Sequence, residues 1–358
     1  MASIQEVIQE GGGTSNDINT GVAWDQANIQ DWTRAGEIQK ILNRLSQNDA
    51  GSYVDALEKV TPTDSVVIVG TTQDFNDLIS EQVAARLSGQ GLSSGDVFEK
   101  RGAWVQALYS HAKKDNTAQS SGFTGKTQGV AFGLDGDVSK EVTVGIGYAY
   151  NSTNIDSHGT DTDVDGHTVF TYAKYQPSDW YLRGMLGYRY AQYEETANVS
   201  GINKKAKYHV SNYATRGYIG YDLPYDFTPE AGLRFVRIDG QSYTDTIGQH
   251  VKTDNIDVLT ASLGMNYSTM VKTAGRVWSP KAYLTLTYDV LSDNSGAQVN
   301  VGDSVYSVTG EKLNRFGIET GLGAEISLGA WDLSAEYDLG IRHNYINNTG
   351  MLKAKYNF

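Results

Sequence analysis

Gly350-Met-Leu-Lys-Ala-Lys-Tyr-Asn-Phe358 closes the chain and shows the pattern that decides the fold. A strand of this sequence has one largely apolar face, because side chains on a strand alternate between its two faces. That face carries Leu352, Ala354, Tyr356 and Phe358. An unpaired strand edge with apolar side chains invites aggregation. A closed barrel removes the edge, since its last strand pairs with its first.

The composition excludes several classes of protein. The chain has 358 residues, no cysteine and a formal net charge of −13. It therefore has no disulfide or thiolate metal site, and no overall positive charge with which to bind nucleic acid. No run approaches the roughly 20 apolar residues of a membrane-spanning helix. The 39 glycines, and the 23 tyrosines against 9 phenylalanines, favour a membrane β-barrel, because the tyrosine ring suits a membrane–water interface.

The first hundred residues read as helices and linkers. We expect residues 1–30, which are polar and include Gly11-Gly12-Gly13, to be poorly ordered. Residues 31–70 are expected to be largely helical, with one apolar stripe from Trp32 to Leu45 and a second from Tyr53 to Val60. Residues 71–101 are expected to form a helix capped by Thr72, followed by a Gly/Ser linker. The apolar stripe of that helix is Phe75, Leu78, Ile79, Val83 and Leu87.

From Gly102 onward the period of the apolar pattern is two. The alternation predicts about twelve strands: 102–112, 124–138, 141–154, 163–176, 180–195, 208–223, 227–238, 254–270, 278–291, 313–328, 331–345 and 350–358. Strands in soluble sheets average about five or six residues, whereas a tilted strand needs about 9–11 to cross a bilayer. The strand lengths therefore favour a membrane barrel.

The connections between these strands predict how the barrel is oriented. Short turns alternate with longer polar loops at 113–123, 155–162, 196–207, 239–253 and 292–312. Outer-membrane barrels keep their short turns on the periplasmic side. We therefore expect Gly102 and Phe358 to lie together at the periplasmic rim, and the number of strands to be even.

The order of these elements resembles the translocator domain of a classical (type Va) autotransporter of the bacterial outer membrane. The stretches that carry the resemblance are the helix 72–87, the opening strand 102–111, the strand 331–345 and the terminal Lys355-Tyr-Asn-Phe358. It implies an all-β membrane protein, in which residues 102–358 form a 12-stranded antiparallel transmembrane β-barrel with an N-terminal α-helix plugging the lumen.

The same resemblance implies a function and partners. The domain would act in type V secretion as translocator and anchor of an N-terminal passenger, of which residues 1–70 would be a remnant. Its surroundings would be outer-membrane lipid. The β-barrel assembly machinery would recognise the last strand through Leu352, Ala354, Tyr356 and Phe358, and the protein would be a monomer.

The lumen of such a barrel is expected to be wet and charged. A helix is about 10–12 Å across, and twelve strands enclose slightly more space than the eight-stranded barrel that side chains alone fill. One helix therefore plugs the pore, whereas a folded domain does not fit. The residues expected to line the wall are Arg183, Arg189, Lys281, Glu319, Glu325 and Glu336.

No motif points firmly to catalysis, and we expect no enzyme activity, cofactor or metal site. Gly302-Asp303-Ser304-Val305 resembles the start of GDSL-type esterases but lies in an expected loop. Asn76-Asp77 is loosely similar to the Asn at which some autotransporters cut themselves inside the pore, with Glu319 or Glu325 assisting. An Asn in the first turn of a helix is also a common capping or solvated residue. The alternative functions are a stand-alone outer-membrane porin with an N-terminal plug and, with less support, a lipase or protease barrel.

Overall fold

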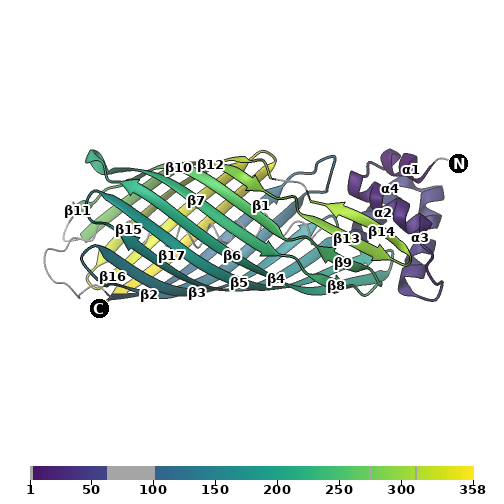
Figure 1. Ribbon diagram of the computed structural model, residues 1–358, viewed down its shortest axis with the longest axis horizontal. Helices are drawn as coiled ribbons and strands as arrows, with labels where there is room; N and C mark the ends of the chain where they lie inside the picture. Colours follow the sequence, from purple (N-terminus) through teal and green to yellow (C-terminus); the bar gives the residue numbers. More distant parts are fainter. Residues whose placement is uncertain (1–2, 63–100, 274–275, 311–312) are drawn as a thin grey trace.

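The computed structural model describes residues 3–62, 101–273, 276–310 and 313–358. In this part of the chain, twelve long antiparallel strands form a closed barrel (Figure 1). They are β1 (Arg101–Lys114), β2 (Phe123–Asp137), β3 (Val142–Ser157), β4 (Thr160–Tyr175), β5 (Trp180–Val199), β6 (Ile202–Tyr221), β7 (Phe227–Asp239), β10 (Ile256–Ser268), β12 (Arg276–Ser292), β15 (Phe316–Leu328), β16 (Trp331–Arg342) and β17 (Tyr345–Asn357). A 3₁₀ turn, η1 (Pro224–Asp226), joins β6 to β7.

The first and last strands close the barrel. β1 pairs with β17 from Gly102 opposite Asn357 to Lys114 opposite Tyr345. Pairing of β10 with β12 completes the ring, and the short β11 (Val271–Thr273) extends the β12 hairpin. The predicted twelve-stranded closed barrel is confirmed, and both of its chain ends lie at one rim.

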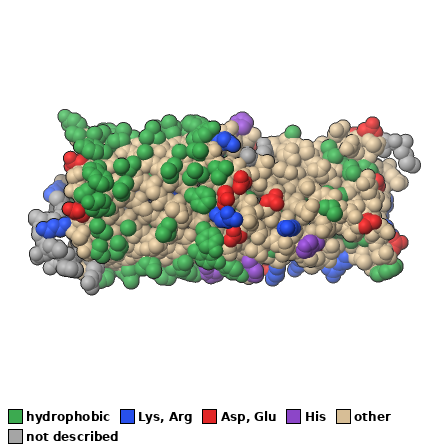
Figure 2. Space-filling model, viewed as in Figure 1, with side chains coloured by type: hydrophobic (Ala, Val, Ile, Leu, Met, Phe, Trp, Pro, Cys, Tyr) green, Lys and Arg blue, Asp and Glu red, His purple; other side chains and the backbone are tan. Residues whose placement is uncertain are grey.

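The two faces of each strand alternate as the sequence predicts. On β3 the side chain of Ile146 is 63% exposed, whereas its neighbours Gly145 and Gly147 are buried. On β15 the side chain of Leu322 is 67% exposed and Gly321 is buried. Figure 2 shows the exposed apolar side chains gathered over the half of the barrel nearer the C-terminus. This band is the surface that faces lipid.

Aromatic side chains mark both edges of the lipid-facing band. At the C-terminal rim the rings of Tyr175 and Trp180 lie 5.7 Å apart. At the other edge the ring of Tyr150 lies 5.3 Å from that of His167, which pairs across the next strand with Tyr190. Aromatic residues are enriched at membrane–water interfaces. On β5 the span from Trp180 to Tyr190 matches the ~9–11 residues that a tilted strand needs to cross a bilayer.

Several strands continue far beyond this band, which corrects two of the expected loops. Residues 155–162 and 196–207 are almost entirely strand, and the turns that join their hairpins are tight. His158-Gly159 and Ser200-Gly201 both have positive φ angles, as two-residue hairpin turns require. The outward side chains here are polar because they face water, and for that reason these stretches resemble loops in the sequence.

Two other expected loops also contain strands. Residues 239–253 include β8 (Ser242–Thr244) and β9 (His250–Thr253), and residues 292–312 include β13 (Gly296–Val301) and β14 (Ser304–Thr309). These four strands form a second sheet in the order β14-β13-β9-β8. It stands at the end of the barrel opposite the C-terminus (Figure 1).

Residues 1–30 are not disordered throughout, contrary to expectation. The helices α1 (Ile4–Glu10) and α2 (Ser15–Gln26) precede α3 (Arg34–Asn48) and α4 (Ala50–Val60). Ser3 with Glu6, and Thr14 with Asp17, form capping boxes that start α1 and α2. Ile8 and Trp24 are buried in the resulting bundle, which explains why these polar-looking segments are ordered.

One residue of the N-terminal region, Trp32, is placed differently from expectation. Trp32 was expected on the buried stripe, but it precedes the N-cap Thr33 of α3 and is 81% exposed. The predicted pore helix 72–87 lies outside the described residues, as do its stripe and Asn76-Asp77. None of the four described helices is long and apolar enough to cross a membrane.

Candidate functional site

The barrel lumen is lined by ion pairs that join strands across the wall. The Arg183 guanidinium on β5 donates to both carboxylate oxygens of Glu230 on β7, each at 2.7 Å. The hydroxyl of Tyr181 also donates to Glu230, at 2.7 Å. Arg183 stacks over the ring of Tyr218, 3.9 Å from its centroid. These contacts span β6, which lies between the two strands, and so fix the wall locally.

Similar pairs occur around the ring. Arg234 on β7 donates to both oxygens of Glu319 on β15, at 2.8 and 2.7 Å. Lys281 lies 3.6 Å from Glu325 and 3.8 Å from Glu336. Arg and carboxylate paired through two hydrogen bonds hold a defined geometry, which a single Lys contact does not. The lumen wall is therefore charged with both signs and largely self-neutralised.

The structure places all six predicted wall residues on the inward face. Arg183, Lys281, Glu319, Glu325 and Glu336 take part in the pairs above, and Arg189 is buried beside Gly166. Sequence reasoning missed the partners Glu230 and Arg234, and the pair of Asp289 with Arg342, whose nearest atoms are 2.6 Å apart. These residues occupy inward positions in the alternation along their strands, and that alternation would have identified them as wall residues.

Glycines on the wall make room for flat aromatic rings. A side chain at Gly145 would collide with the ring of Tyr172 on the next strand, and one at Gly220 with the ring of Tyr181. The Tyr172 ring also accepts a hydrogen bond at its hydroxyl from Trp104 Nε1, 2.9 Å away. Rings that lie against glycine occupy less of the lumen, so the abundance of Gly and Tyr keeps the pore wide.

The terminal strand presents its apolar side chains to the outside. Leu352 is 66% exposed and Phe358 is 62% exposed. The ring of Tyr356 packs 5.0 Å from that of Trp331 and 6.1 Å from that of Phe358. The expected assembly signal thus lies at the C-terminal rim, with Phe358 making few contacts of its own.

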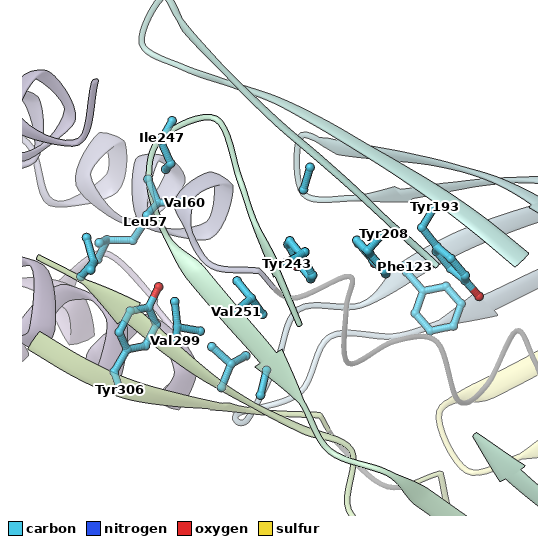
Figure 3. Packing of buried hydrophobic residues seen from close by; sticks show 14 of the residues in the cluster. Leu57, Val60, Phe123, Tyr193, Tyr208, Tyr243, Ile247, Val251, Val299 and Tyr306 are labelled. Carbon is cyan, nitrogen blue, oxygen red and sulfur yellow. The ribbon is translucent and has the colours of Figure 1, made fainter. Parts of the chain in front are cut away.

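The N-terminal helices cover the other end of the barrel. We call α1–α4 (residues 4–60) the cap. The second sheet, together with the ends of the hairpins β1–β2, β3–β4 and β5–β6, is called the platform. Figure 3 shows Leu57 and Val60 of the cap beside Ile247, Val251, Val299 and Tyr306 of the platform. These residues belong to one buried apolar cluster, which continues through Tyr208, Tyr193 and Phe123 into the end of the barrel beneath the cap.

The position of the cap places the two ends of one segment on opposite sides of the barrel. α4 ends beside Lys204 at the platform, whereas β1 begins at the C-terminal rim opposite Asn357. Residues 63–100 therefore join the two ends of the barrel. At a maximum of roughly 3.3 Å per residue, 38 residues reach about 125 Å, well beyond the roughly 66 Å of a 20-residue strand such as β5.

Asp303 of the GDSV motif has a structural role. Its side chain accepts a hydrogen bond from the backbone N–H of Asn28 at 2.7 Å, at the turn between β13 and β14. Gly302 has a positive φ of 57° and lies against the backbone of Asn28, so a side chain there would be strained. The motif serves the contact between cap and platform.

Comparisons with known proteins agree with this architecture. The family model described as "Autotransporter beta-domain" matches residues 103–338. Outer membrane protein A of Rickettsia conorii is 23% identical over 93% of this chain, and outer membrane protein B of Rickettsia prowazekii is 22% identical over 94%. The chain spans 18% and 23% of these two relatives, respectively.

Solved structures share the fold. The translocator domain of the autotransporter NalP from Neisseria meningitidis gives a TM-score of 0.64 at 15% identity, covering 81% of this chain and 98% of that one. The β-domain of the Bordetella autotransporter BrkA gives a TM-score of 0.56 at 22% identity, covering 74% of this chain and 100% of that one. The porin alternative gains no comparable support. The chain belongs to the autotransporter β-domain family and is a translocator barrel of the bacterial outer membrane.

Proposed function

We propose that this barrel exports a passenger attached upstream of the cap and then anchors it in the outer membrane. The observation that carries the proposal is the opposed placement of α4 and β1 at the two ends of the barrel. β1 begins at the rim with the short turns, which is the periplasmic side in such barrels. Residues 3–62 lie on the far side, and this placement supports the proposal that the N-terminal part crosses the membrane.

The width of the lumen supports passage of an unfolded chain. A twelve-stranded barrel admits about one helix or one extended hairpin. The cap, with four packed helices, is too wide for that opening. We propose that the cap and the passenger cross unfolded and fold outside, which makes return through the lumen unfavourable.

Two partners complete the proposal. We propose that the β-barrel assembly machinery recognises the exposed side chains of Leu352, Tyr356 and Phe358 at the terminal strand. A closed barrel has no free strand edge in the membrane band, and this supports a monomer. We also propose that the barrel works without catalysis, since the described wall residues pair with one another.

Surface exposure of a tag tests the direction of crossing. An epitope placed before Ser3 is expected to bind antibody on intact cells. A matched tag in the short turn at Ser139-Lys140 is expected to bind only after the outer membrane is permeabilised. Binding of the first tag only after permeabilisation would contradict the proposed export.

A further inference from the structure

The cap contacts the platform at five separate connections between strands. In the β1–β2 connection, the Ala118 carbonyl accepts a hydrogen bond from Ser15 N at 3.2 Å, and the Ser121 hydroxyl donates to Glu58 at 2.9 Å. The β3–β4 turn brings Gly159 against the side chain of Lys59. The β5–β6, β8–β9 and β13–β14 hairpins contribute the contacts described next. Contacts on so many sides fix the cap in one orientation.

The last turn of α4 is held by a buried polar junction. Lys204 Nζ on β6 donates to the carbonyl of Val60 at 3.0 Å and to that of Lys59 at 3.3 Å. The Gln249 amide satisfies all its neighbours when its oxygen faces the donors Tyr306 and Trp24. In that orientation, Nε2 donates to the Val60 carbonyl at 3.0 Å and to Asp245 at 2.8 Å. Lys204 is 2% exposed and Gln249 is 0% exposed. The final carbonyls of a helix have no partner within the helix, so these donors complete α4.

Further contacts tie this junction to both sides of the interface. Gln249 Oε1 accepts hydrogen bonds from Tyr306 on β14 at 2.7 Å and from Trp24 Nε1 of α2 at 3.3 Å. On the neighbouring strand, Glu195 is 1% exposed and accepts from the Tyr208 hydroxyl at 2.5 Å. The Lys204 ammonium also interacts electrostatically with the carboxylates of Glu195 and Asp245, so in the docked state it is a shared partner of two acids and two helix carbonyls. Removing the cap would strip Lys204 of both carbonyl acceptors.

The cap also covers a sheet edge. The Asn16 amide donates to the Thr309 carbonyl at 2.9 Å and accepts from the Thr309 N–H at 3.0 Å, and Asn19 donates to the Ser307 carbonyl at 3.2 Å. β14 is the outer strand of the platform sheet, so these amides satisfy the groups that a neighbouring strand would otherwise pair. The cap thus completes the hydrogen bonding of the platform as well as its apolar core.

We propose that the cap is a non-covalent anchor, which holds the exported polypeptide at the outer mouth even when the chain between Pro62 and Arg101 is cut. The interface combines a shared apolar core with polar contacts at two sites, the Lys204 junction and the covered β14 edge. These contacts therefore hold the cap on the platform without a covalent link between the two. The inference rests on the proposed function only in placing the passenger upstream of the cap.

Cleavage of the purified full chain tests the anchor. A flexible insert with a protease recognition sequence is placed after Pro62, and the folded protein is cut in a mild detergent. The fragment that carries the cap is expected to co-elute with the barrel in size-exclusion chromatography. Separation of the cap from the barrel within the time of one column run would overturn the proposal. Since no export step is involved, this result is independent of the surface-tag experiment.

Substitutions locate the anchoring contacts. Lys204→Met keeps the side-chain length but removes the donors, and is expected to speed release of the cut cap at least ~10-fold. Lys205→Met, at an exposed neighbour on the same strand, is expected to leave the rate unchanged. Asn16→Ala, at the β14 edge, is expected to speed release by a similar factor and serves if Lys204→Met does not fold. Rates equal to that of Lys205→Met for both variants would overturn the assignment.

Hydrogen exchange on the uncut chain gives a second measure if the insert resists the protease. The amides of α4 are expected to be protected in the wild type and to exchange at least ~10-fold faster in Lys204→Met. Exchange of α4 at the rate of an unfolded peptide in the wild type would show that the cap is not held.

Discussion

The side-chain amide of Asn16 exchanges two hydrogen bonds with the backbone of Thr309, so a helix completes the pairing of a sheet edge. Asn16 is 2% exposed, so water cannot readily replace it as the partner of the Thr309 carbonyl and N–H. The pairing imitates the way in which two antiparallel strands exchange N–H and C=O groups. Through these two bonds, α2 takes the place of a neighbouring strand at the edge of the platform sheet.

Replacing Asn16 by Ala is therefore expected to destabilise the docked cap by about 1–3 kcal/mol, because buried backbone groups of Thr309 lose their partners. Hydrogen exchange of residues 15–26 as a function of denaturant measures the loss. Asn43→Ala, at an exposed position of α3, is the matched control. Equal protection of α2 in the two variants would mean that the Thr309 pairing contributes no stability.

An arginine on the lipid face tests the register of the barrel. Leu322 lies midway along β15 and is exposed to lipid, so Leu322→Arg is expected to cost about 2–4 kcal/mol of folding free energy in a bilayer. Ser279→Arg is the control, because Ser279 faces inward and pairs across the sheet with Glu325. Folding into lipid vesicles in urea measures both variants, and equal losses would show that the faces are assigned wrongly.

Phe358 is expected to matter for assembly in cells more than for stability. Its ring contacts that of Tyr356 at the rim and is otherwise largely exposed. Deleting Phe358 should therefore leave folding into pure lipid almost unchanged but strongly reduce the amount in the outer membrane. Phe358→Trp should retain assembly. A large loss of stability in pure lipid would point instead to a packing role.

Docking of the cap is expected to weaken as pH rises. Burial raises the pKa of Asp17, of Glu58 and of Asp245, although Lys204 lowers the pKa of Asp245 in part and His158 lowers those of the other two in part. A raised pKa means that the docked state binds protons more tightly. The stability that these protonated carboxyl groups give to the docked cap is fully present below their ordinary pKa values of 3.8 and 4.5. It is lost as pH rises through their raised pKa values in the docked state.

Denaturant midpoints of cap unfolding at pH 5 and pH 8 measure this dependence. The N-cap Asp49 has a lowered pKa because Ser52 donates to it, but it is already ionised in both states within this range. Asp245→Asn is expected to reduce the difference between the two midpoints. A cap that is more stable at pH 8 would contradict the expected sign.

Deletions separate the cap from the helix predicted at residues 72–87. If that helix plugs the lumen, removal of residues 3–62 should leave the conductance in planar bilayers small, whereas removal of residues 1–90 should open the channel. Equal small conductance after both deletions would place the predicted helix outside the lumen. The plug remains a prediction, since it lies outside the described residues.

The barrel was predictable from sequence because a period of two is a local signal. Strand number, closure and the inward phase of Arg183 and Glu319 follow directly from it. Which charges pair was not predictable, since Arg234 and Glu319 are 85 positions apart and reach each other across two intervening strands. Pairing at that range depends on barrel curvature and not on any local pattern.

The order of the cap and the strand ends at the platform were not predicted from the sequence, for two different reasons. The capping boxes at Ser3 and Thr14 are readable in the sequence, but the glycine run between them suggested disorder. The ends of β5 and β6 resemble loops because their outward side chains, such as Asn198 and Lys207, are polar. Their inward side chains, such as Val199 and Ala206, are apolar and form part of the core beneath the cap.

β5 thus reverses its polarity partway along. Up to Tyr190, β5 turns apolar side chains such as Leu186 outward and Arg183 inward, whereas beyond it Glu194 faces out and Tyr193 faces in. The point of reversal sets the depth at which the protein sits in its membrane. Moving that point by two residues, on strands tilted about 40°, would shift the water boundary by about 5 Å. The chain therefore specifies the thickness of the membrane that it fits, and its sequence can be tuned to thinner or thicker bilayers without any change in strand pairing.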